Sequence, residues 1–384
     1  MALVLLVQLA IASGLPYRRI IAQKWVNGNT ASGHSRPRLP FGCLLPRGTI
    51  ICRVKTAGTE TGHYVAAALC GRIPQRNADG GFGVQEVDFS EQFQQMIHDM
   101  HRGVEQSPFY PSYIRAHLGG SNSRLVTFSR TICPEIEYHC GPLAGRRVLD
   151  FGCGTGASTA ALAQLTESVA AFDVWPESIK IAEQRLRELG LPDRVEFYCA
   201  DDIDDINDRM GTFDVILVFG VIEHLPISTT GLRERVLRSV ADLLKTPGYL
   251  FVGDTPNRIW PTDSHTTGLW WLPWSRPGSN WSYSRAVEKG RYARTEHYSS
   301  GPRGLEEQGA WGATYWEIEH YLRDAGLTCV NMLEGHNRHL FYAGSRSRKA
   351  AIFESVMRAT ACKLFRAPIT AFAPYINNLV FRRR

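Results

Sequence analysis

The chain has 384 residues, of which 44% are apolar and 21% are charged, and its formal net charge is +6. This composition is that of a folded globular protein and excludes disordered and fibrous classes. The length allows one large domain with additions, or two domains. Positive charge gathers at the C-terminal end, where residues 345–384 hold nine basic side chains and one acid, Glu354. The nine cysteines form no CxxC pair and no zinc-ligand spacing, which favours reduced thiols in a cytosolic protein.

The N-terminal region begins with a short apolar run, LVLLVQLAIA, at residues 3–12. The run is too short to span a bilayer, and no Lys or Arg precedes it as in a signal peptide. We therefore interpret residues 1–88 as a poorly patterned extension and expect a cytoplasmic location. A helical lead-in is expected over 89–145, because an apolar stripe with helical spacing opens it. The stripe consists of Phe89, Phe93, Met96, Ile97 and Met100.

From residue 146 onward, strand patterns alternate with helix patterns. The expected strands are 147–151, 168–174, 194–200, 213–220, 248–254, 327–333 and 376–381, and the clearest helices are 176–190, 229–245 and 314–326. This alternation predicts an α/β fold over 146–384, with a doubly wound, mostly parallel, Rossmann-like sheet of seven strands. Two inserts interrupt it, a tryptophan-rich one at 255–312 on the substrate side and a basic helical one at 346–372.

The first strand leads into a glycine-rich turn, DFGCGTG, that contains Asp150, Gly152, Gly154 and Gly156. Open α/β sheets bind ligands at the carboxyl ends of their strands, and glycine allows the backbone to approach a ligand closely. Taken alone, the turn is ambiguous. The spacing of Gly152, Gly154 and Ala157 also fits the dinucleotide-binding pattern.

Acidic residues at the ends of the first three strands separate the two interpretations. Asp150 places a carboxylate beside the ligand, which suits a cationic sulfonium and an amino group better than a pyrophosphate. Asp173 ends the second strand and can accept both ribose hydroxyls, which fits either cofactor. Asp201 and Asp202 follow the third strand and can accept from the exocyclic amine of adenine.

Four motifs occur in order over about 145–335, namely VLDFGCGTG, AFDV, CADD and FDVILVFGVIEHLP. Together they resemble the class I S-adenosylmethionine-dependent methyltransferases, and GVIEHLP with the following TPN is similar to the ubiquinone-biosynthesis O-methyltransferases. The resemblance implies S-adenosyl-L-methionine as cofactor, with Asp173 on the ribose and Asp201 on the adenine, and an antiparallel last strand. The candidate cofactor-binding residues are Asp150, Gly152, Cys153, Gly154, Thr155, Gly156, Asp173, Val174, Asp201, Asp202 and Phe219.

Candidate catalytic residues follow the fourth and fifth strands. Methyl transfer to a hydroxyl requires alignment of the acceptor and removal of its proton, and a histidine is a suitable base. We expect His224 or His265 to be the base and Glu223 to position it, although Glu223 and His224 could instead only cap the loop. Small-RNA terminal 2′-O-methyltransferases are also similar here, and their Glu-x-x-Glu-His set with a downstream His binds a divalent metal. Gly220 stands where the first Glu would be, so we expect no metal.

The two inserts carry the predictions about partners. Six of the nine tryptophans lie in or next to 255–312, and we expect them to form a lid over an apolar acceptor or, alternatively, a satellite core. The stretch 350–365 is amphipathic with basic flanks, which predicts peripheral membrane contact through 346–372. The alternative is an insert that packs on the sheet.

We therefore expect a methyltransferase that uses S-adenosyl-L-methionine to methylate an oxygen of a small-molecule or lipid-linked acceptor. Three alternatives stay open, namely an RNA 2′-O-methyltransferase, a non-catalytic cofactor-binding protein of the same fold and an NAD-dependent oxidoreductase. No aromatic-plus-basic surface module is recognisable, so a nucleic-acid partner is not expected. The acceptor and the oligomeric state are not predicted by any pattern in the chain.

Overall fold

A computed structural model describes residues 87–103, 110–120, 123–205, 207–292, 297–330 and 348–384. All of these residues belong to one of the two units into which the chain divides, Cys70–Arg384. The predicted N-terminal extension, except for residues 87–88, lies outside the described residues, as does the end of the predicted sixth strand at 331–333.

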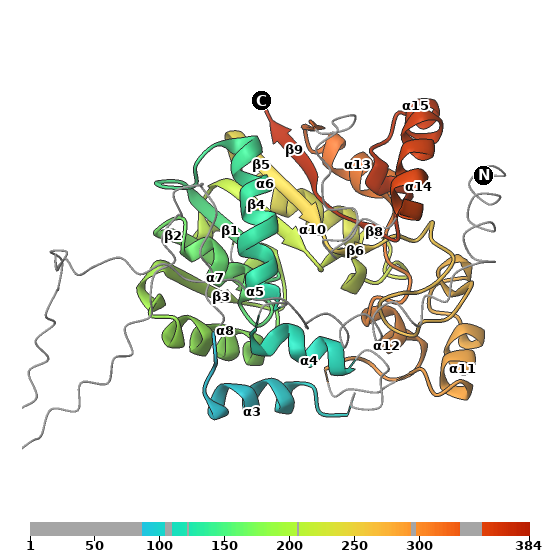
Figure 1. Ribbon diagram of the computed structural model, residues 1–384, viewed down its shortest axis with the longest axis horizontal. Helices are drawn as coiled ribbons and strands as arrows, with labels where there is room; N and C mark the ends of the chain where they lie inside the picture. The colour runs from blue at the N-terminus through green and yellow to red at the C-terminus, as the bar shows by residue number, and fades with distance from the viewer. Residues whose placement is uncertain (1–86, 104–109, 121–122, 206, 293–296, 331–347) are drawn as a thin grey trace, which may run out of the picture. The chain divides into compact units, whose positions relative to one another are not determined.

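One sheet of seven strands, in the order β3-β2-β1-β4-β5-β9-β7, forms the centre of this unit (Figure 1). The strands are β1 (Arg147–Phe151), β2 (Ser168–Asp173), β3 (Val195–Cys199), β4 (Phe213–Phe219), β5 (Leu244–Gly253), β7 (Leu327–Cys329) and β9 (Leu379–Arg383). The strands β1 to β5 pair in parallel, whereas β9 pairs antiparallel with β5 and β7. The predicted mostly parallel sheet with an antiparallel last strand is therefore confirmed.

The last strand begins later than predicted. Residues Tyr375–Ile376 form a separate short strand, β8, which pairs with β6 (Thr255–Pro256) outside the main sheet. Asn378 has φ 52°, a left-handed conformation that interrupts the extended chain between β8 and β9. Because of this break, the C-terminal segment makes two separate contacts. Its strand β9 pairs within the main sheet, and its strand β8 pairs with β6 in the loop after β5.

Helices flank the sheet. They are α3 (Glu91–Met100), α4 (Tyr110–Leu118), α5 (Arg124–Thr127), α6 (Cys133–Cys140), α7 (Ala157–Ala163), α8 (Pro176–Glu188), α9 (Asn207–Met210), α10 (Leu232–Asp242), α11 (Asn280–Glu288), α12 (Pro302–Glu307), α13 (Tyr315–Asp324), α14 (Arg348–Ala359) and α15 (Ala361–Phe365). The strand order runs in opposite directions from β1 and from β4, so right-handed crossovers place α7 and α10 on opposite faces. In Figure 1 the column formed by α5 and α6 crosses in front of the strands.

Local sequence signals explain where several elements begin and end. The strand β4 is almost entirely buried, as its apolar run FDVILVF predicts for a central parallel strand. The helix α8 starts with Pro176 and is followed by Gly190 at φ 69°. A capping box between Thr314 and Glu317 opens α13, within the helix predicted at 314–326.

The lead-in packs on α8 through the predicted apolar stripe. Phe93 and Ile97 are fully buried, and Phe89 is almost so. The guanidinium of Arg185, itself buried on α8, lies 4.9 Å from the ring centre of Phe89 and 4.7 Å from that of Phe93. The lead-in is therefore part of the folded unit, and its helices approach the carboxyl end of the sheet.

Gly156 offers a test of how the glycine turn packs. It has φ 76°, and a Cβ at this position would lie 2.7 Å from the Cβ of Ala182 in α8. We expect Gly156→Ala to cost about 1–2 kcal/mol for the left-handed conformation and about 1–3 kcal/mol more for overpacking. Gly190→Ala is the matched control, because Gly190 has φ 69° but nothing within 4 Å. Urea unfolding measures both, and equal losses would contradict the packing argument.

Candidate active site

The glycine-rich turn after β1 is tightly folded and leaves room at its centre. Gly152, Gly154 and Gly156 have φ values of 76°, 51° and 76°. The N–H groups of Gly152 and Cys153 both donate to the carbonyl of Phe172 in β2, at 2.8 and 2.9 Å. A Cβ on Gly154 would meet nothing within 4 Å, so the turn presents open backbone at this point.

Asp173 connects the end of β2 to this turn. One carboxylate oxygen accepts from the N–H of Gly154 at 2.8 Å, and the other accepts from the N–H of Trp175 at 2.9 Å. Burial raises the pKa of Asp173, whereas these backbone hydrogen bonds lower it. The carboxylate is thus fixed in place at the cavity wall, and each of its oxygens can accept a further hydrogen bond from a ligand hydroxyl.

Asp150 lies behind the turn rather than in the cavity wall. One of its oxygens accepts from the hydroxyls of Ser158 at 2.7 Å and Thr159 at 2.6 Å, in the first turn of α7. The side chain is buried, and burial raises its pKa. The structure therefore shows Asp150 joining the turn to α7, and direct contact with the cofactor stays a prediction.

Of the remaining predicted cofactor residues, all except Gly156 line a cavity of about 590 Å³ at the carboxyl ends of β1, β2 and β4. These residues are Gly152, Cys153, Gly154, Thr155, Asp173, Val174, Asp201, Asp202 and Phe219. Asp202 is paired with Arg235 at 2.7 Å, whereas Asp201 is exposed at the rim. A nucleoside with a charged tail fits this donor set, because carboxylates follow two strands and open backbone follows the first.

Four residues of the lead-in also line the cavity. Met100 belongs to the predicted apolar stripe, whereas no sequence motif marks Tyr113, His117 and Arg124. Arg124 donates to Asp254, which also lines the cavity, at 3.1 Å. Asp254 follows β5 and has φ 56°, which is strained for a residue with a side chain. A Cβ on Gly220 would lie 3.8 Å from the Arg124 guanidinium and 3.9 Å from the Asp254 carboxylate. Gly220, which stands where the metal-binding relatives have a glutamate, thus lies next to the Arg124–Asp254 ion pair.

The predicted catalytic residues meet at one end of the cavity. Glu223, His224 and His265 each offer one ligand atom, and these atoms all lie within 4.8 Å of one another. The two imidazole rings are 5.5 Å apart, and Thr255 donates to the Glu223 carboxyl at 3.2 Å. Such a group can handle a proton, and its donor set could also hold a metal ion.

Hydrogen bonding fixes the tautomer of His224. Its Nδ1 lies 2.8 Å from the backbone carbonyl of Glu307, and a carbonyl can only accept. Nδ1 therefore carries the proton, and Nε2 has a free lone pair when the ring is neutral. Burial lowers the pKa of His224 and lowers that of His265 to about 3, so both rings are neutral at pH 7.

Glu223 has the opposite shift. Its side chain is almost fully buried, and burial raises its pKa to about 8, with a further increase from the charge of Asp254. Glu223 is therefore largely protonated at pH 7 and ionises just above it. A titration in this range is typical of functional carboxyl groups.

The insert after β5 closes the cavity with residues other than its tryptophans. The lining residues from this region are His265, His297, Tyr298, Ser299 and Glu307. The Tyr298 ring lies 6.2 Å from His224, nearly parallel to it, and 6.1 Å from Trp175 after β2. The insert thus extends from the cofactor end of the cavity to Glu223 and His224.

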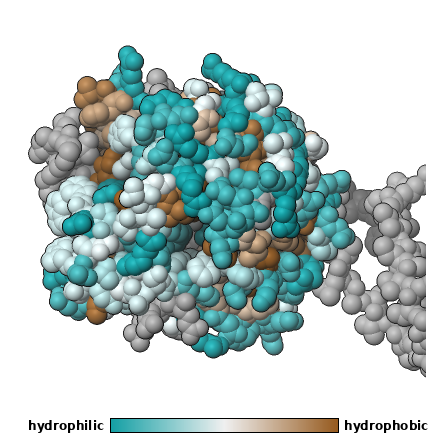
Figure 2. Space-filling view, turned by 180° about the vertical axis from the view of Figure 1, so that it is seen from behind, coloured by the Kyte–Doolittle hydropathy of each residue, from teal (hydrophilic) through white to brown (hydrophobic). Residues whose placement is uncertain are grey.

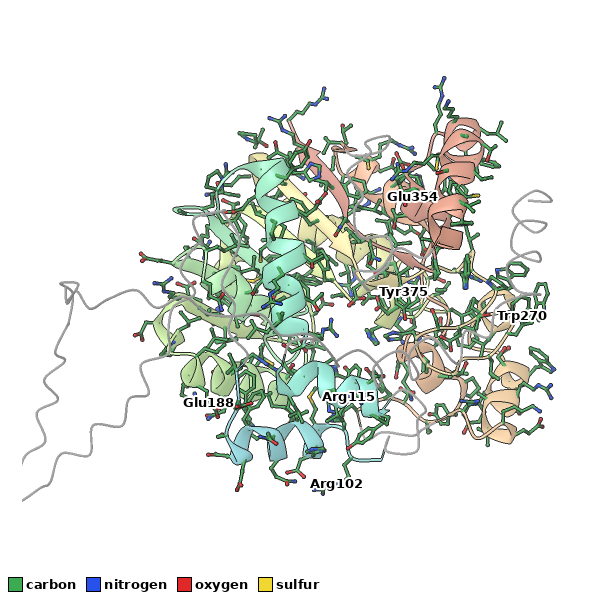
Figure 3. The ribbon with its side chains drawn as sticks, in the orientation of Figure 1. Arg102, Arg115, Glu188, Trp270, Glu354 and Tyr375 are labelled. Atoms are coloured by element: carbon green, nitrogen blue, oxygen red, sulfur yellow. The ribbon has the colours of Figure 1, made fainter. Side chains whose placement is uncertain are left out.

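The prediction of a tryptophan lid is wrong. All six tryptophans lie among the residues that the structure describes, and none of them lines the cavity. Trp311 is buried in a satellite core with Leu272 and Leu305, which is the alternative stated above. Trp270 and Trp271 are 42% and 43% exposed, and Figure 3 shows Trp270 at the outer edge of the molecule. A large flat apolar ring suits a lid and a core equally well, so composition alone could not place these tryptophans.

Comparison with known proteins identifies the domain. Residues 148–248 match the family model described as a methyltransferase domain. The chain carries a class I S-adenosylmethionine-dependent methyltransferase domain. The match includes the glycine turn, Asp173 and the loop with Glu223 and His224, and it indicates that the enzyme uses S-adenosylmethionine.

Curated relatives of this methyltransferase agree with that assignment. The chain is 28% identical over 198 residues to the ubiquinone biosynthesis O-methyltransferase of Bordetella avium, which covers 52% of this chain and 78% of that protein. It is 36% identical over 116 residues to the protein of the same name from Xanthomonas euvesicatoria, and this match spans 45% of that relative. Among solved structures, an S-adenosylmethionine-dependent methyltransferase from Clostridium acetobutylicum matches with a TM-score of 0.42 and 14% identity, covering 72% of this chain and 96% of that one.

Proposed function

We propose that this enzyme transfers a methyl group from S-adenosylmethionine to an oxygen of a small-molecule or lipid-linked acceptor. The observation that carries the proposal is the hydrogen bond from the His224 Nδ1 to the Glu307 carbonyl, which leaves Nε2 able to accept a proton on a side chain grouped with Glu223 and His265. A base held this way can remove a hydroxyl proton, which an oxygen acceptor requires. The name of the Bordetella avium relative, an O-methyltransferase, supports the same choice.

The residues of the chain divide the work between two ends of the cavity. When bound, S-adenosylmethionine supplies a methyl group on a positively charged sulfur. Asp173 would hold the ribose hydroxyls, and Asp201 would face the adenine. His224 takes the proton from the acceptor hydroxyl, and Glu223, once ionised, stabilises the imidazolium that results. Tyr298 and His265 exclude water from the acceptor.

The experiment uses the full-length chain, S-adenosylmethionine and a small acceptor panel. A catechol carrying a short prenyl chain tests oxygen, the corresponding aniline tests nitrogen, and a ribo-oligonucleotide with Mg²⁺ tests the RNA alternative. We expect methylation of the catechol alone, detected by mass spectrometry. Methylation of the aniline or the oligonucleotide alone would contradict the proposal. Binding of S-adenosylhomocysteine without turnover on a broader panel of hydroxyl acceptors would favour the non-catalytic alternative.

The expectation that no metal takes part stays a prediction. The donor atoms of Glu223, His224 and His265 are close enough to hold an ion, while Gly220 leaves the fourth position without a carboxylate. Dialysis against a chelator before the assay separates the cases. We expect activity on the catechol to survive this treatment, and its loss and recovery with a divalent ion would show the metal-dependent alternative.

Peripheral membrane contact is proposed for the basic C-terminal helices, which would bring the enzyme to a lipid-linked acceptor. Among the described helices, none is long and apolar enough to cross a membrane. The predicted single stretch forms two helices, α14 and α15, and exposes Ile352 to 63%, Leu364 to 74% and Phe365 to 44%. Lys363 and Arg366 flank the last two residues. In Figure 1 these helices lie at the upper right. Figure 2 views the molecule from behind, and it shows apolar residues at the upper left, which is the same side.

Vesicle co-sedimentation tests this contact. We expect Leu364→Glu with Phe365→Glu to lower the bound fraction on phosphatidylglycerol vesicles about tenfold or more, because two apolar side chains no longer enter the interface. Val287→Glu is the control. Val287 is 48% exposed, and it lies on α11, outside the segment 346–372. Equal partitioning of the two proteins would refute membrane contact through this face.

A further inference from the structure

A buried histidine of the lead-in, His117 on α4, contacts the glycine-rich turn. Its ring is 4% exposed, and its Nδ1 lies 2.7 Å from the hydroxyl oxygen of Thr155. It also forms part of the cavity wall. No sequence motif marks this residue, and the function proposed above assigns it no role.

Arg185 holds the histidine and the turn together from behind. Its guanidinium donates to the Thr155 carbonyl at 2.7 Å, to the His117 carbonyl at 2.9 Å and to the Thr155 hydroxyl oxygen at 3.4 Å. Arg185 is 1% exposed, so these are fixed contacts rather than surface pairs. The positions of His117 and of the turn are therefore set by the same side chain.

These contacts favour one of the two tautomers of His117. Arginine can only donate, so the Thr155 oxygen accepts from Arg185 and its own proton can be donated to another acceptor. The His117 Nδ1 lies within reach of that proton, and in this arrangement Nδ1 is unprotonated and Nε2 carries the ring proton. Burial lowers the pKa of His117 far below its usual value, with further decreases from Arg124, His101 and Arg185, so the ring is neutral.

The Nε2–H group of His117 is buried, and among the described residues no atom accepts a hydrogen bond from it. A buried donor without an acceptor costs about 1–3 kcal/mol, so a ligand that supplies an acceptor at this point is favoured. His117 and Arg124 both line the cavity that the glycine turn also lines, and a negatively charged acceptor there would also be attracted to the arginine.

We propose that His117 is a positioning residue that donates from Nε2 to the carboxylate of the methionine part of the cofactor. Of the polar groups on that part, the ammonium group can only donate, and only the carboxylate can accept from an N–H. The Thr155 hydroxyl orients the ring, and Arg185 holds both residues in place. His117 would therefore fix the tail of S-adenosylmethionine and, through the tail, the direction of its methyl group.

Two substitutions separate this role from a purely structural one. His117→Gln keeps an N–H donor near the position of Nε2 but loses the acceptor for Thr155, whereas His117→Asn keeps an acceptor near Nδ1 and loses the distal donor. Calorimetry would measure binding of S-adenosylhomocysteine and of 5′-methylthioadenosine, which lacks the amino-acid tail. We expect His117→Asn to weaken S-adenosylhomocysteine binding about 10- to 100-fold and His117→Gln to weaken it less than about 5-fold. Binding of 5′-methylthioadenosine should change less than about 3-fold in both.

The proposal is overturned if the Asn variant binds S-adenosylhomocysteine as well as the original protein, or if both ligands lose equal affinity. A measurement on the unaltered protein guards against misfolded variants. In nitrogen NMR, S-adenosylhomocysteine should shift the Nε2 resonance of His117, and its decarboxylated analogue should leave that resonance in place. Equal shifts with both ligands would also overturn the proposal.

Discussion

Replacement of His224 by alanine is expected to lower kcat about 10²- to 10⁴-fold, the usual contribution of a positioned general base. The reason is the free Nε2, which the bond from Nδ1 to the Glu307 carbonyl leaves available for the acceptor proton. Binding of S-adenosylhomocysteine should change less than about 3-fold, because His224 lies at the acceptor end of the cavity. Steady-state kinetics and calorimetry on the same preparation measure both.

A matched control is His320→Ala on α13, where the side chain is 56% exposed and contacts Arg323 and Asp324 of the same helix. This variant should retain full activity. If His224→Ala kept more than about a tenth of the original kcat, the ring would only shape the loop, which is the non-catalytic role considered for this motif.

Activity should increase with pH until about 8 and then level off, and Glu223→Gln should abolish this increase. The raised pKa of Glu223, about 8 because of burial, leaves the group mostly neutral at pH 6. Below its pKa the ionised fraction increases about tenfold per pH unit, so kcat should increase about 10- to 100-fold between pH 6 and 8. Burial lowers the pKa of both His224 and His265, so these rings titrate at lower pH than Glu223 does.

Stability should follow the opposite trend, since the neutral form of Glu223 is the one that the buried site favours. A carboxyl group with a pKa raised on folding contributes stability that is present below about pH 4.5 and is lost as the pH approaches 8. Glu223→Gln should therefore unfold at a temperature that depends less on pH between 5 and 8.

A flat activity profile in the original protein would mean that ionised Glu223 takes no part in turnover.

The sheet was predictable because its signals are local. β4 is an uninterrupted apolar run, α8 has proline at its start and glycine after its end, and the glycine turn falls where β1 meets α7. Backbone geometry in such places depends on a few neighbouring residues. The break between β8 and β9 was missed because it depends on one left-handed residue, Asn378, within a run that otherwise reads as a strand.

The cavity was predictable only in part, because some of its lining residues are brought together by contacts between distant segments. Asp173 ends β2 and Glu223 comes shortly after β4, so strand order alone brings them to one edge of the sheet. Arg124 lies 130 positions from its partner Asp254, and Tyr298 meets His224 only through the folding of the insert. No periodicity encodes such pairings, and burial of Asp150 behind the turn likewise depends on hydroxyls of α7.

The hydrogen bond between His224 and the Glu307 carbonyl joins the proposed base to the insert that encloses the acceptor. If the insert moved away, the ring would lose the contact that holds its Nδ1 proton and sets its direction. Enclosure and base activation would then be one event, so an open site, still filled with water, would be unable to begin the reaction. Such an arrangement would protect the methyl donor from wasteful hydrolysis until an acceptor has filled the space beside Tyr298.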